Sequence, residues 1–546
     1  MLLTERRRIT ASGPALALFA SVFAVHGVIA LVVGTHGWDD GSITVAFART
    51  FADSGRIAMT PLSEVVEGYS SPFWMLVLAA TFRVLPLDFN GMLLASQLWA
   101  AIFAALGSAL LYLLSRPFLK SAALPLSFVV FVSSGFFNET ANGMEMTALS
   151  AAALAMIWAL RTRGRMPFVF ALAALIPWIR LEAAGYVIAG AVLVAVVSRD
   201  YRRATALIGG ALVSVVVLTG LRLAIFDSVL PNTMLAKQSA PYPYSTTLAE
   251  RLAGCKTVTK EILYVCAPGA IIAVGALLGR RPEPGVIHTA LTRLRARSVT
   301  PVIGYAAGYL AGVAAANLVL GPNWGYLGRM EQSSAAVAVM FVVYCVPRAT
   351  RTLQAPLRLA GVVVALLLVA AYGVDHQRVD AVAHPGDAEA ITPAAYRQTG
   401  EALEVVRRAL GHESMSVLTP DIGGTSLCCT NLQVLDSGLL ANGELARQGY
   451  VALGGYLTTN RPDAIVTHSV WSDASHLYEL PYFRPNYSPV TVDGMWFYLR
   501  NDLLDRLADR CTDIPTAATE SFRYRGTEID ETYIRTLGLT SVCELR

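Results

Sequence analysis

Two adjacent carboxylates, Asp39 and Asp40, directly follow the first long apolar stretch of the chain. Acids held beside a membrane could supply a general base or hold a divalent cation. A simpler alternative is a helix start, because residues 41–53 have an amphipathic pattern and Asp is favoured there. Neighbouring carboxylates on a turn point in different directions, so we expect one to face the reacting groups. The pair therefore supplies the candidate catalytic residues and the only candidate metal ligands, and the metal and cofactor stay open.

A second acidic segment follows in the same loop. It reads Glu-Val-Val-Glu-Gly-Tyr-Ser-Ser-Pro-Phe-Trp over residues 64–74. An acid followed by glycine, tyrosine, small polar residues, proline and an aromatic is more specific than ordinary loop composition. Glu67 and Tyr69 are therefore candidate substrate-binding residues.

Four further polar segments lie between apolar stretches, and they supply the remaining candidate binding residues: Glu145, Arg180, Glu182, Asn232, Lys237 and Arg329. The cations among them could bind an anion, Arg through a planar fork and Lys as a point charge. Structural alternatives exist for each. Arg180 and Glu182 could pair within a short turn, Glu145 could cap a helix, Lys237 could extend towards lipid headgroups and Arg329 could be an ordinary interfacial arginine.

The composition indicates what kind of elements position these residues. Of the 546 residues, 54% are apolar and only 15% charged, whereas a soluble domain has roughly 25% charged residues. Residues 1–374 contain 29 basic and 16 acidic side chains, a net of +13, and residues 375–546 contain 14 basic and 23 acidic ones, a net of −9. We therefore expect a membrane domain over 1–374 and a water-soluble domain over 375–546.

Apolar stretches close to the roughly 20 residues that span a bilayer recur along the first part. They cover residues 14–34, 91–114, 121–137, 144–161, 183–198, 204–224, 259–278, 299–320, 333–346 and 357–374, with shorter ones at 72–86 and 166–178. Arginine-rich turns, such as those at 161–165, 199–203 and 280–297, mark the cytoplasmic side. The sequence predicts about 11 transmembrane helices, with the polar segments and the tail on the outer face.

The tail, residues 375–546, alternates short β-rich runs with helical ones. Strands are expected at 416–419, 433–435 and 464–467 and helices at 394–410 and 503–511, which predicts an α/β domain. Its four cysteines permit two disulfides on the outer face. We expect the vicinal Cys428 and Cys429 to pair with Cys511 and Cys543 rather than with each other. The tail aromatics Trp471, Trp496, Tyr478, Tyr482 and Tyr487 could stack on sugar rings or build the domain core.

The ordered set of external segments resembles the integral-membrane GT-C glycosyltransferases that use polyprenyl-phosphate sugars. It is most similar to the family of the mycobacterial terminal β-(1→2)-arabinofuranosyltransferase. The resemblance rests on the acidic pair, the EGYSSPFW, GMEM, RLEA and PNTMLAK segments, and a weaker DSGL echo at 436–439. Serines replace a Thr-Asn pair at 70–71, Leu181 replaces a proline, Ala183 replaces a glycine, and Met234-Leu235 replace two aromatics.

This resemblance implies an inverting membrane glycosyltransferase with a GT-C-like fold. Its donor would be a polyprenyl-phosphate sugar of the decaprenyl-phosphate-arabinofuranose kind, and its acceptor a polysaccharide or glycoconjugate of the cell envelope, such as an arabinogalactan or lipoarabinomannan. It also implies a multi-pass protein of the bacterial inner membrane, with the tail on the periplasmic side.

Other functions were weighed against this one. A protein acceptor of the pilin type would need the same chemistry. A lipid or glycan transporter or flippase should show repeated hydropathy halves with sites near the midplane, whereas the charged residues here lie at one edge. A scaffold would leave the acidic pair and the Lys237 segment without a purpose. The sequence contains no phosphate loop of an ATP-driven pump and no nucleic-acid signature.

Overall fold

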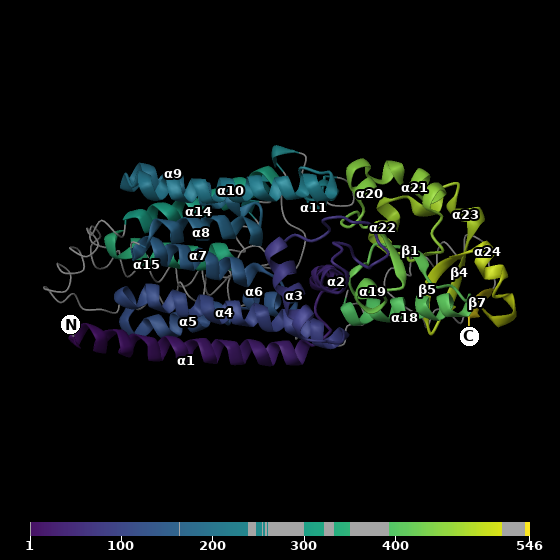
Figure 1. The fold of residues 1–546 in the computed structure, drawn as a ribbon, viewed down its shortest axis with the longest axis horizontal. Coiled ribbons are helices and arrows are strands. Elements are labelled where there is room, and N and C mark those ends of the chain that lie inside the picture. Colours follow the sequence, from purple (N-terminus) through teal and green to yellow (C-terminus); the bar gives the residue numbers. More distant parts are fainter. Residues whose placement is uncertain are drawn as a thin grey trace. The chain divides into compact units, whose positions relative to one another are not determined.

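The structure is a computed structural model that describes residues 2–162, 164–238, 300–320, 332–349, 392–515 and 541–545, with short pieces between 247 and 259 (Figure 1). Its internal contacts group the chain into two compact units. Unit 1 comprises Met1–Val32, Ser96–Leu218 and Ser245–Ala383, and unit 2 comprises Val33–Ala95, Thr219–Tyr244 and His384–Arg546. The domain boundary expected between residues 374 and 375 lies outside the described residues, so that division stays a prediction.

Unit 1 is built from apolar helices. Three helices, α1, α4 and α10, have residues in both units. The helices that supply unit 1 are α1 (Leu2–Val33), α4 (Phe89–Leu119), α5 (Ala123–Phe131), α6 (Ser134–Ala141), α7 (Met146–Arg161), α8 (Met166–Ile179), α9 (Ala183–Ser198), α10 (Tyr201–Phe226), α14 (Thr300–Leu320) and α15 (Gln332–Ala349).

Four helical runs within the described residues are long and apolar enough to cross a membrane: Gly13–Val33, Phe89–Phe131, Tyr201–Phe226 and Thr300–Val319. Shorter apolar helices accompany them, and α9 has the bounds expected from the sequence. By length and composition this is a multi-pass membrane protein. The stretches at 259–278 and 357–374 lie outside the described residues, and the total of about 11 spans stays a prediction.

Glycines set the contact between α9 and α14 in unit 1. Gly304, Gly308 and Gly312 recur every four residues along α14. A Cβ atom on Gly308 would lie 2.3 Å from the Ala189 carbonyl oxygen and 2.6 Å from the Gly190 Cα. Such close backbone approach is typical of membrane helices. Lipid gives no hydrophobic driving force for helix association, so the helices associate through close van der Waals packing, which small residues allow. This spacing is a signal that the sequence analysis missed.

Residues 39–84 of unit 2 form two helices with well-defined ends. Helix α2 (Asp39–Ser54) ends at Gly55, whose left-handed conformation (φ 72°) lets its N–H donate to Phe51. Helix α3 (Pro72–Val84) begins after Ser71, whose side chain accepts from the Trp74 N–H, with proline at the first position. Part of the EGYSSPFW segment is thus a helix start. The expected amphipathic helix after Asp40 exists, but the pattern is not that of an interfacial helix, because every residue of α2 from 41 to 48 is buried.

The tail is an α/β structure, as expected. Its sheet has the strand order β2-β1-β3-β5-β4-β7-β6. The strands are β1 (Met415–Thr419), β2 (Leu432–Asp436), β3 (Ala464–Ile465), β4 (Tyr487–Val492), β5 (Met495–Arg500), β6 (Cys511–Pro515) and β7 (Ser541–Leu545). Strand β1 pairs in parallel with β2 and β3, while β4 and β5 form an antiparallel hairpin.

Short helices surround this sheet. In unit 2 the described helices besides α2 and α3 are α11 (Asn232–Ala236), α18 (Pro393–Ala409), α19 (Gly423–Cys428), α20 (Gly443–Gln448), α21 (Leu453–Asn460), α22 (Ser469–Ala474), α23 (Phe483–Asn486) and α24 (Asn501–Asp505). Thr392 caps α18 by accepting from the Ala395 N–H, and Pro393 opens the helix. The helix expected at 503–511 is wrong at its end, because α24 stops at Asp505 and Cys511 starts β6.

Most tail aromatics pack in the core. Tyr487 is 4% exposed, and its hydroxyl donates to the Pro462 carbonyl oxygen at 2.7 Å. The half-buried Trp471, Tyr478 and Tyr482 pack against the same core. Trp496 is half-buried on β5. Core packing therefore accounts for Tyr487, and a sugar-stacking role stays a prediction for the half-buried rings.

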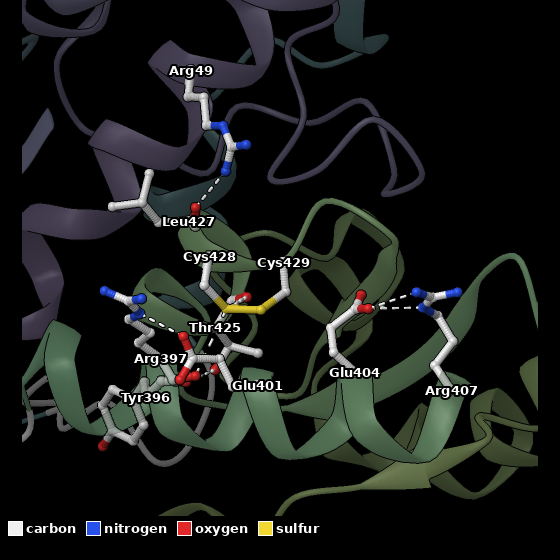
Figure 2. Close-up of a disulfide and its surroundings, with 10 residues drawn as sticks. All are labelled: Arg49, Tyr396, Arg397, Glu401, Glu404, Arg407, Thr425, Leu427, Cys428 and Cys429. Carbon is white, nitrogen blue, oxygen red and sulfur yellow. Dashed lines mark hydrogen bonds and ion pairs between the residues drawn. A yellow bond between two sulfur atoms is a disulfide. The ribbon is translucent and has the colours of Figure 1, made fainter. Parts of the chain in front are cut away.

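The expected disulfide pairing is wrong. Cys428 bonds to Cys429, and Cys511 bonds to Cys543. The second bond follows from the sheet, because β6 and β7 are antiparallel neighbours with Cys511 opposite Leu545 and Asp513 opposite Cys543. Figure 2 shows the vicinal disulfide at the end of α19, where the Leu427 carbonyl oxygen accepts from Arg49 of α2 at 2.5 Å.

Candidate functional site

The acid pair starts α2 and holds a segment of the tail. The Asp39 side chain is buried, and its two carboxylate oxygens accept from the backbone N–H groups of Gly423 (2.9 Å) and Gly424 (2.8 Å). The Ser42 hydroxyl donates to the same carboxylate at 2.5 Å. Asp39 thus binds the start of α19, which packs against α2 and α18. It neither caps its own helix nor points into open space.

Only glycine fits at the centre of this contact. A Cβ atom on Gly423 would lie 2.1 Å from the Ser42 Oγ and 2.6 Å from both Asp39 carboxylate oxygens. Such distances are far below ordinary van der Waals contact, so a side chain there would displace the carboxylate. The glycine pair of the tail is therefore part of the Asp39 site, and the sequence analysis missed it.

Burial changes the acidity of Asp39. It raises the pKa of the carboxyl to about 7, while the hydrogen bonds from Ser42 and the two glycines lower it and nearby Asp421 raises it. Asp421 in turn pairs with His468 at 3.1 Å. The site therefore holds an Asp39 carboxyl group whose charge changes near neutral pH.

Asp40 differs from its neighbour in exposure. It is half-buried, in the first turn of α2, next to the fully engaged Asp39. The expectation that one of the two carboxylates faces the reacting groups stays a prediction. Of the pair, Asp40 is the more exposed residue.

The acidic segment after α2 pairs with an arginine that the sequence analysis did not single out. The Glu67 carboxylate accepts from Arg222 Nε at 2.5 Å and Nη2 at 2.9 Å, and both side chains are buried. Burial raises the pKa of Glu67 and the Arg222 charge lowers it. The third nitrogen, Nη1, is buried and has no hydrogen-bond partner among the described residues. The signal for Arg222 was its place inside an apolar stretch, where a charge is costly and usually functional.

Tyr69 packs beside this ion pair. Its ring lies edge-on to Phe47 of α2, with 5.2 Å between ring centroids. Burial raises the pKa of the Tyr69 hydroxyl, as does the Glu67 charge, while Arg222 lowers it. Tyr69 is therefore neutral at physiological pH and connects α2 to the Glu67 segment.

Two segments that the sequence analysis had linked only by resemblance meet in unit 2. The Asn232 side-chain amide donates to the carbonyl oxygens of Leu439 (3.1 Å), the last DSGL residue, and Leu440 (2.8 Å). Glu64 accepts from the Gly443 N–H at 3.1 Å. A Cβ atom on Gly68 would lie 2.8 Å from the Ala441 Cβ. The EGY and PNT segments thus both hold tail residues 439–443.

Asp436 shapes the same tail turn. Its carboxylate accepts from the backbone N–H groups of Gly438 and Ala441, both at 2.6 Å. Burial raises its pKa to about 7, and these hydrogen bonds lower it. Asp436 therefore fixes the turn that Asn232 binds. Lys237 lies half-buried at the end of α11.

A second buried charge cluster lies in unit 1. Arg180 donates from Nε to Glu182 at 2.7 Å and from Nη1 to Glu145 at 2.9 Å. The Arg180 side chain is 7% exposed. The structural pairing of Arg180 with Glu182 in a short turn is thus present, and Glu145 joins it. Glu145 occupies the capping position of α7 without capping it, because Glu139 accepts from the Met146 N–H instead.

Two further residues stand apart from these clusters. Arg329 lies outside the described residues. His26 of α1 is buried and bonds to the Thr140 hydroxyl and the Phe131 carbonyl oxygen, both at 2.7 Å.

The acid pair was also the candidate for a divalent cation. Within the described ranges, no group of three or more His, Cys, Asp or Glu side chains is placed to hold a metal ion. The Asp39 oxygens are surrounded by N–H and O–H donors, whereas a cation needs free oxygen lone pairs. Asp39 in this arrangement does not fit a metal ligand.

Comparison with known proteins gives a distant likeness. No protein-family model and no curated protein matches the chain. Among solved structures, it is similar to the oligosaccharyltransferase of Archaeoglobus fulgidus in the apo form, with 13% identity over 88% of this chain and 74% of that chain and a TM-score of 0.46. It is also similar to ArnT from Cupriavidus metallidurans in the apo state, with 14% identity over 89% and 98% of the two chains and a TM-score of 0.45. Such values assign no function.

Proposed function

We propose that the protein is an inverting membrane glycosyltransferase that transfers a sugar from a polyprenyl-phosphate donor to an acceptor hydroxyl on the outer face of the membrane. One observation carries the proposal. Asp39, Glu64 and Asn232, from three segments of the first part of the chain, all form hydrogen bonds with the backbone of tail residues 423–443 within one compact unit. Their segments are among those on which the family resemblance rests.

Asp40 is the proposed general base. The acceptor hydroxyl gives its proton to the Asp40 carboxylate while its oxygen attacks the anomeric carbon from the face opposite the phosphate. The bond between the anomeric carbon and the phosphate oxygen breaks, and its electron pair stays on the lipid phosphate. The products are an inverted glycoside and a polyprenyl phosphate. Asp39 positions α2 through its bonds to Gly423 and Gly424.

The departing phosphate requires fixed positive charge. Lys237 is one proposed ligand, at the end of the loop that Asn232 anchors. Arg222 is another, because its Nη1 is buried with no acceptor among the described residues while Glu67 holds the rest of the guanidinium. Arg329 remains a proposed third cation. Arg180 has two carboxylate partners, so we assign it to positioning rather than to the phosphate.

The sugar and acceptor are proposed from the sequence resemblance. Arabinofuranose is the proposed sugar, an envelope glycan is the proposed acceptor, and the bacterial inner membrane, with the tail outside, is the proposed location. The aromatic residues that stay half-buried in the tail, Trp471 and Trp496 among them, are compatible with contacts to a glycan.

Reconstitution of the full chain in vesicles tests this function. We expect transfer of labelled arabinofuranose from a polyprenyl-phosphate donor to a synthetic arabinan, with none from a nucleotide sugar. The product should have the anomeric configuration opposite to that of the donor by NMR. Transfer with retention, or from the nucleotide sugar alone, would contradict the mechanism. Transfer of another sugar from the same lipid carrier would replace arabinofuranose as the proposed sugar and leave the proposed mechanism intact.

A further inference from the structure

A cavity of about 790 Å³ lies in unit 1, and its lining includes no residue placed in the proposed reaction. The end of α9, the start of α10 and the first described turn of α14 line it, together with Met166 at the start of α8. The arginine-rich turn at 199–203 is expected on the cytoplasmic side, where short basic loops gather. Because α10 and α14 include two of the helical runs long enough to cross a membrane, and the cavity is at their ends, we expect it to lie at a membrane edge.

The lining carries an excess of positive charge. Arg199, Arg202 and Arg203 face one acid, Asp200, among the residues that line the cavity. Arg199 and Arg202 are exposed. The cavity also lies at the first turn of the 26-residue helix α10, whose N-terminal end is the positive end of the helix dipole. Charge and dipole therefore both favour an anion.

Arg203, which lines the cavity, has a side-chain N–H group without a hydrogen-bond acceptor among the described residues. Its side chain is only 9% exposed, and its Nη1 pairs with the Asp200 carboxylate. Its Nε is buried and has no hydrogen-bond partner in the part of the chain that the structure describes. A buried N–H without an acceptor is costly. An anionic oxygen bound in the cavity would supply the acceptor that this guanidinium lacks.

We propose that this cavity binds the phosphate group of an anionic membrane lipid through Arg203, Arg202 and Arg199. A phosphate offers several acceptor oxygens to arginine forks, and clusters of basic residues in pockets between membrane helices bind anionic headgroups. The volume exceeds that of one phosphate ion and accommodates a headgroup. The site is independent of the proposed transferase reaction.

Binding is measured on the purified full-length protein in detergent as the rise in melting temperature on adding a ligand. The probes are phosphatidylglycerol, phosphatidylcholine and inorganic phosphate. We expect phosphatidylglycerol to stabilise the protein and phosphatidylcholine to have no effect. Stabilisation by inorganic phosphate to the same extent would make a free phosphate the ligand of the same site and contradict the lipid as its source.

Variants locate the effect. Arg202→Gln removes one exposed charge from the lining and should weaken the apparent affinity for phosphatidylglycerol about fivefold, the effect of roughly one basic residue at a membrane surface. Arg203→Gln should weaken it further. Lys120→Gln removes an exposed cation of unit 1 that does not line the cavity and should leave affinity unchanged.

Equal affinity in all three variants would overturn the site, as would a wild-type protein that none of the probes stabilises. If Arg203→Gln fails to fold, the affinity of Arg202→Gln alone tests the site, because the exposed Arg202 side chain contributes little to folding. A failure to detect transferase activity in vesicles would concern the proposed transferase site. It would not change the melting-temperature measurement of lipid binding at the cavity.

Discussion

The two units use buried charge in different ways. In unit 2, Asp39 binds Gly423, 384 residues away, and Glu67 binds Arg222, 155 residues away. In unit 1, Arg180 binds partners only 2 and 35 residues away. The unit 2 contacts therefore assemble distant segments, whereas the unit 1 cluster stabilises neighbouring helix ends.

The balance of charge differs too. Arg222 has one carboxylate partner, so the Arg222–Glu67 pair has no net charge. The Arg222 Nη1 also has no acceptor among the described residues and can donate to a ligand. Arg180 has two carboxylate partners, which makes that group negative. An anionic phosphate would thus bind at Arg222 at lower cost than at Arg180, which is why we propose a positioning role for Arg180.

Breaking the Glu67–Arg222 pair should have the largest effect. Glu67→Gln leaves a buried arginine charge without its carboxylate, which costs about 3–5 kcal/mol in buried ion pairs. We expect that loss in the free energy of unfolding, measured by denaturant titration of the full chain. Glu64→Gln in the same loop is the matched control, since its amide oxygen can still accept from Gly443. A Glu67→Gln protein as stable as this control would remove the pair from the assembly of unit 2.

The Asp39 contact is tested from the tail side. Gly423→Ala places a methyl group against the Asp39 carboxylate and should cost about 1–3 kcal/mol, as overpacking does. It should also lower transferase turnover, because α19 no longer fits against α2. Gly455→Ala is the control, since nothing lies within 4 Å of its Cβ position. Melting temperatures and initial rates compare the two, and identical behaviour would contradict a structural role for the Asp39 contact.

The unit 1 cluster should tolerate the loss of one acid. Glu182→Gln removes one of two carboxylate partners of Arg180, and Glu145 still neutralises the guanidinium. The expected cost is about 1.5 kcal/mol, the lower end for a hydrogen bond to a charged group. Denaturant titration beside Glu67→Gln gives the comparison directly. A loss as large as that of Glu67→Gln would show that the two clusters do not differ in the way described.

The smallest expected effect is a change in how steeply the stability of the protein depends on pH. The folded-state pKa of Asp39, about 7, lies above its ordinary value near 4, so the folded state holds the proton more tightly between these values. Stability should therefore fall as pH rises from about 4 to about 7. Asp39→Asn should make this fall shallower in melting temperatures measured across the window, whereas Asp53→Asn on the same helix should not. An unchanged slope in Asp39→Asn would contradict the assignment.

Local patterns predicted the helices and strands well. The apolar stretch at 183–198 matches α9, and the β-rich runs at 416–419 and 433–435 lie within β1 and β2. These elements follow from periodicity and composition, which are local properties of the chain.

Long-range contacts were not predictable in the same way. Nothing near Asp39 indicates that its partners are two glycines in the tail, and the vicinal disulfide was expected not to form. Arg222 could have been found, because an arginine within an apolar stretch needs a buried partner. The register of β6 and β7 brings Cys511 and Cys543 together, and no spacing in the sequence encodes that register.

The central claim is that the two adjacent carboxylates have separate roles, Asp40 in chemistry and Asp39 in structure. The most direct measurement is the single-turnover rate of sugar transfer from a polyprenyl-phosphate donor by Asp40→Asn, with Asp53→Asn as the control. We predict a rate about a hundredfold or more below wild type for Asp40→Asn, as expected for loss of a general base, with an unchanged melting temperature. A wild-type rate in Asp40→Asn would contradict the account.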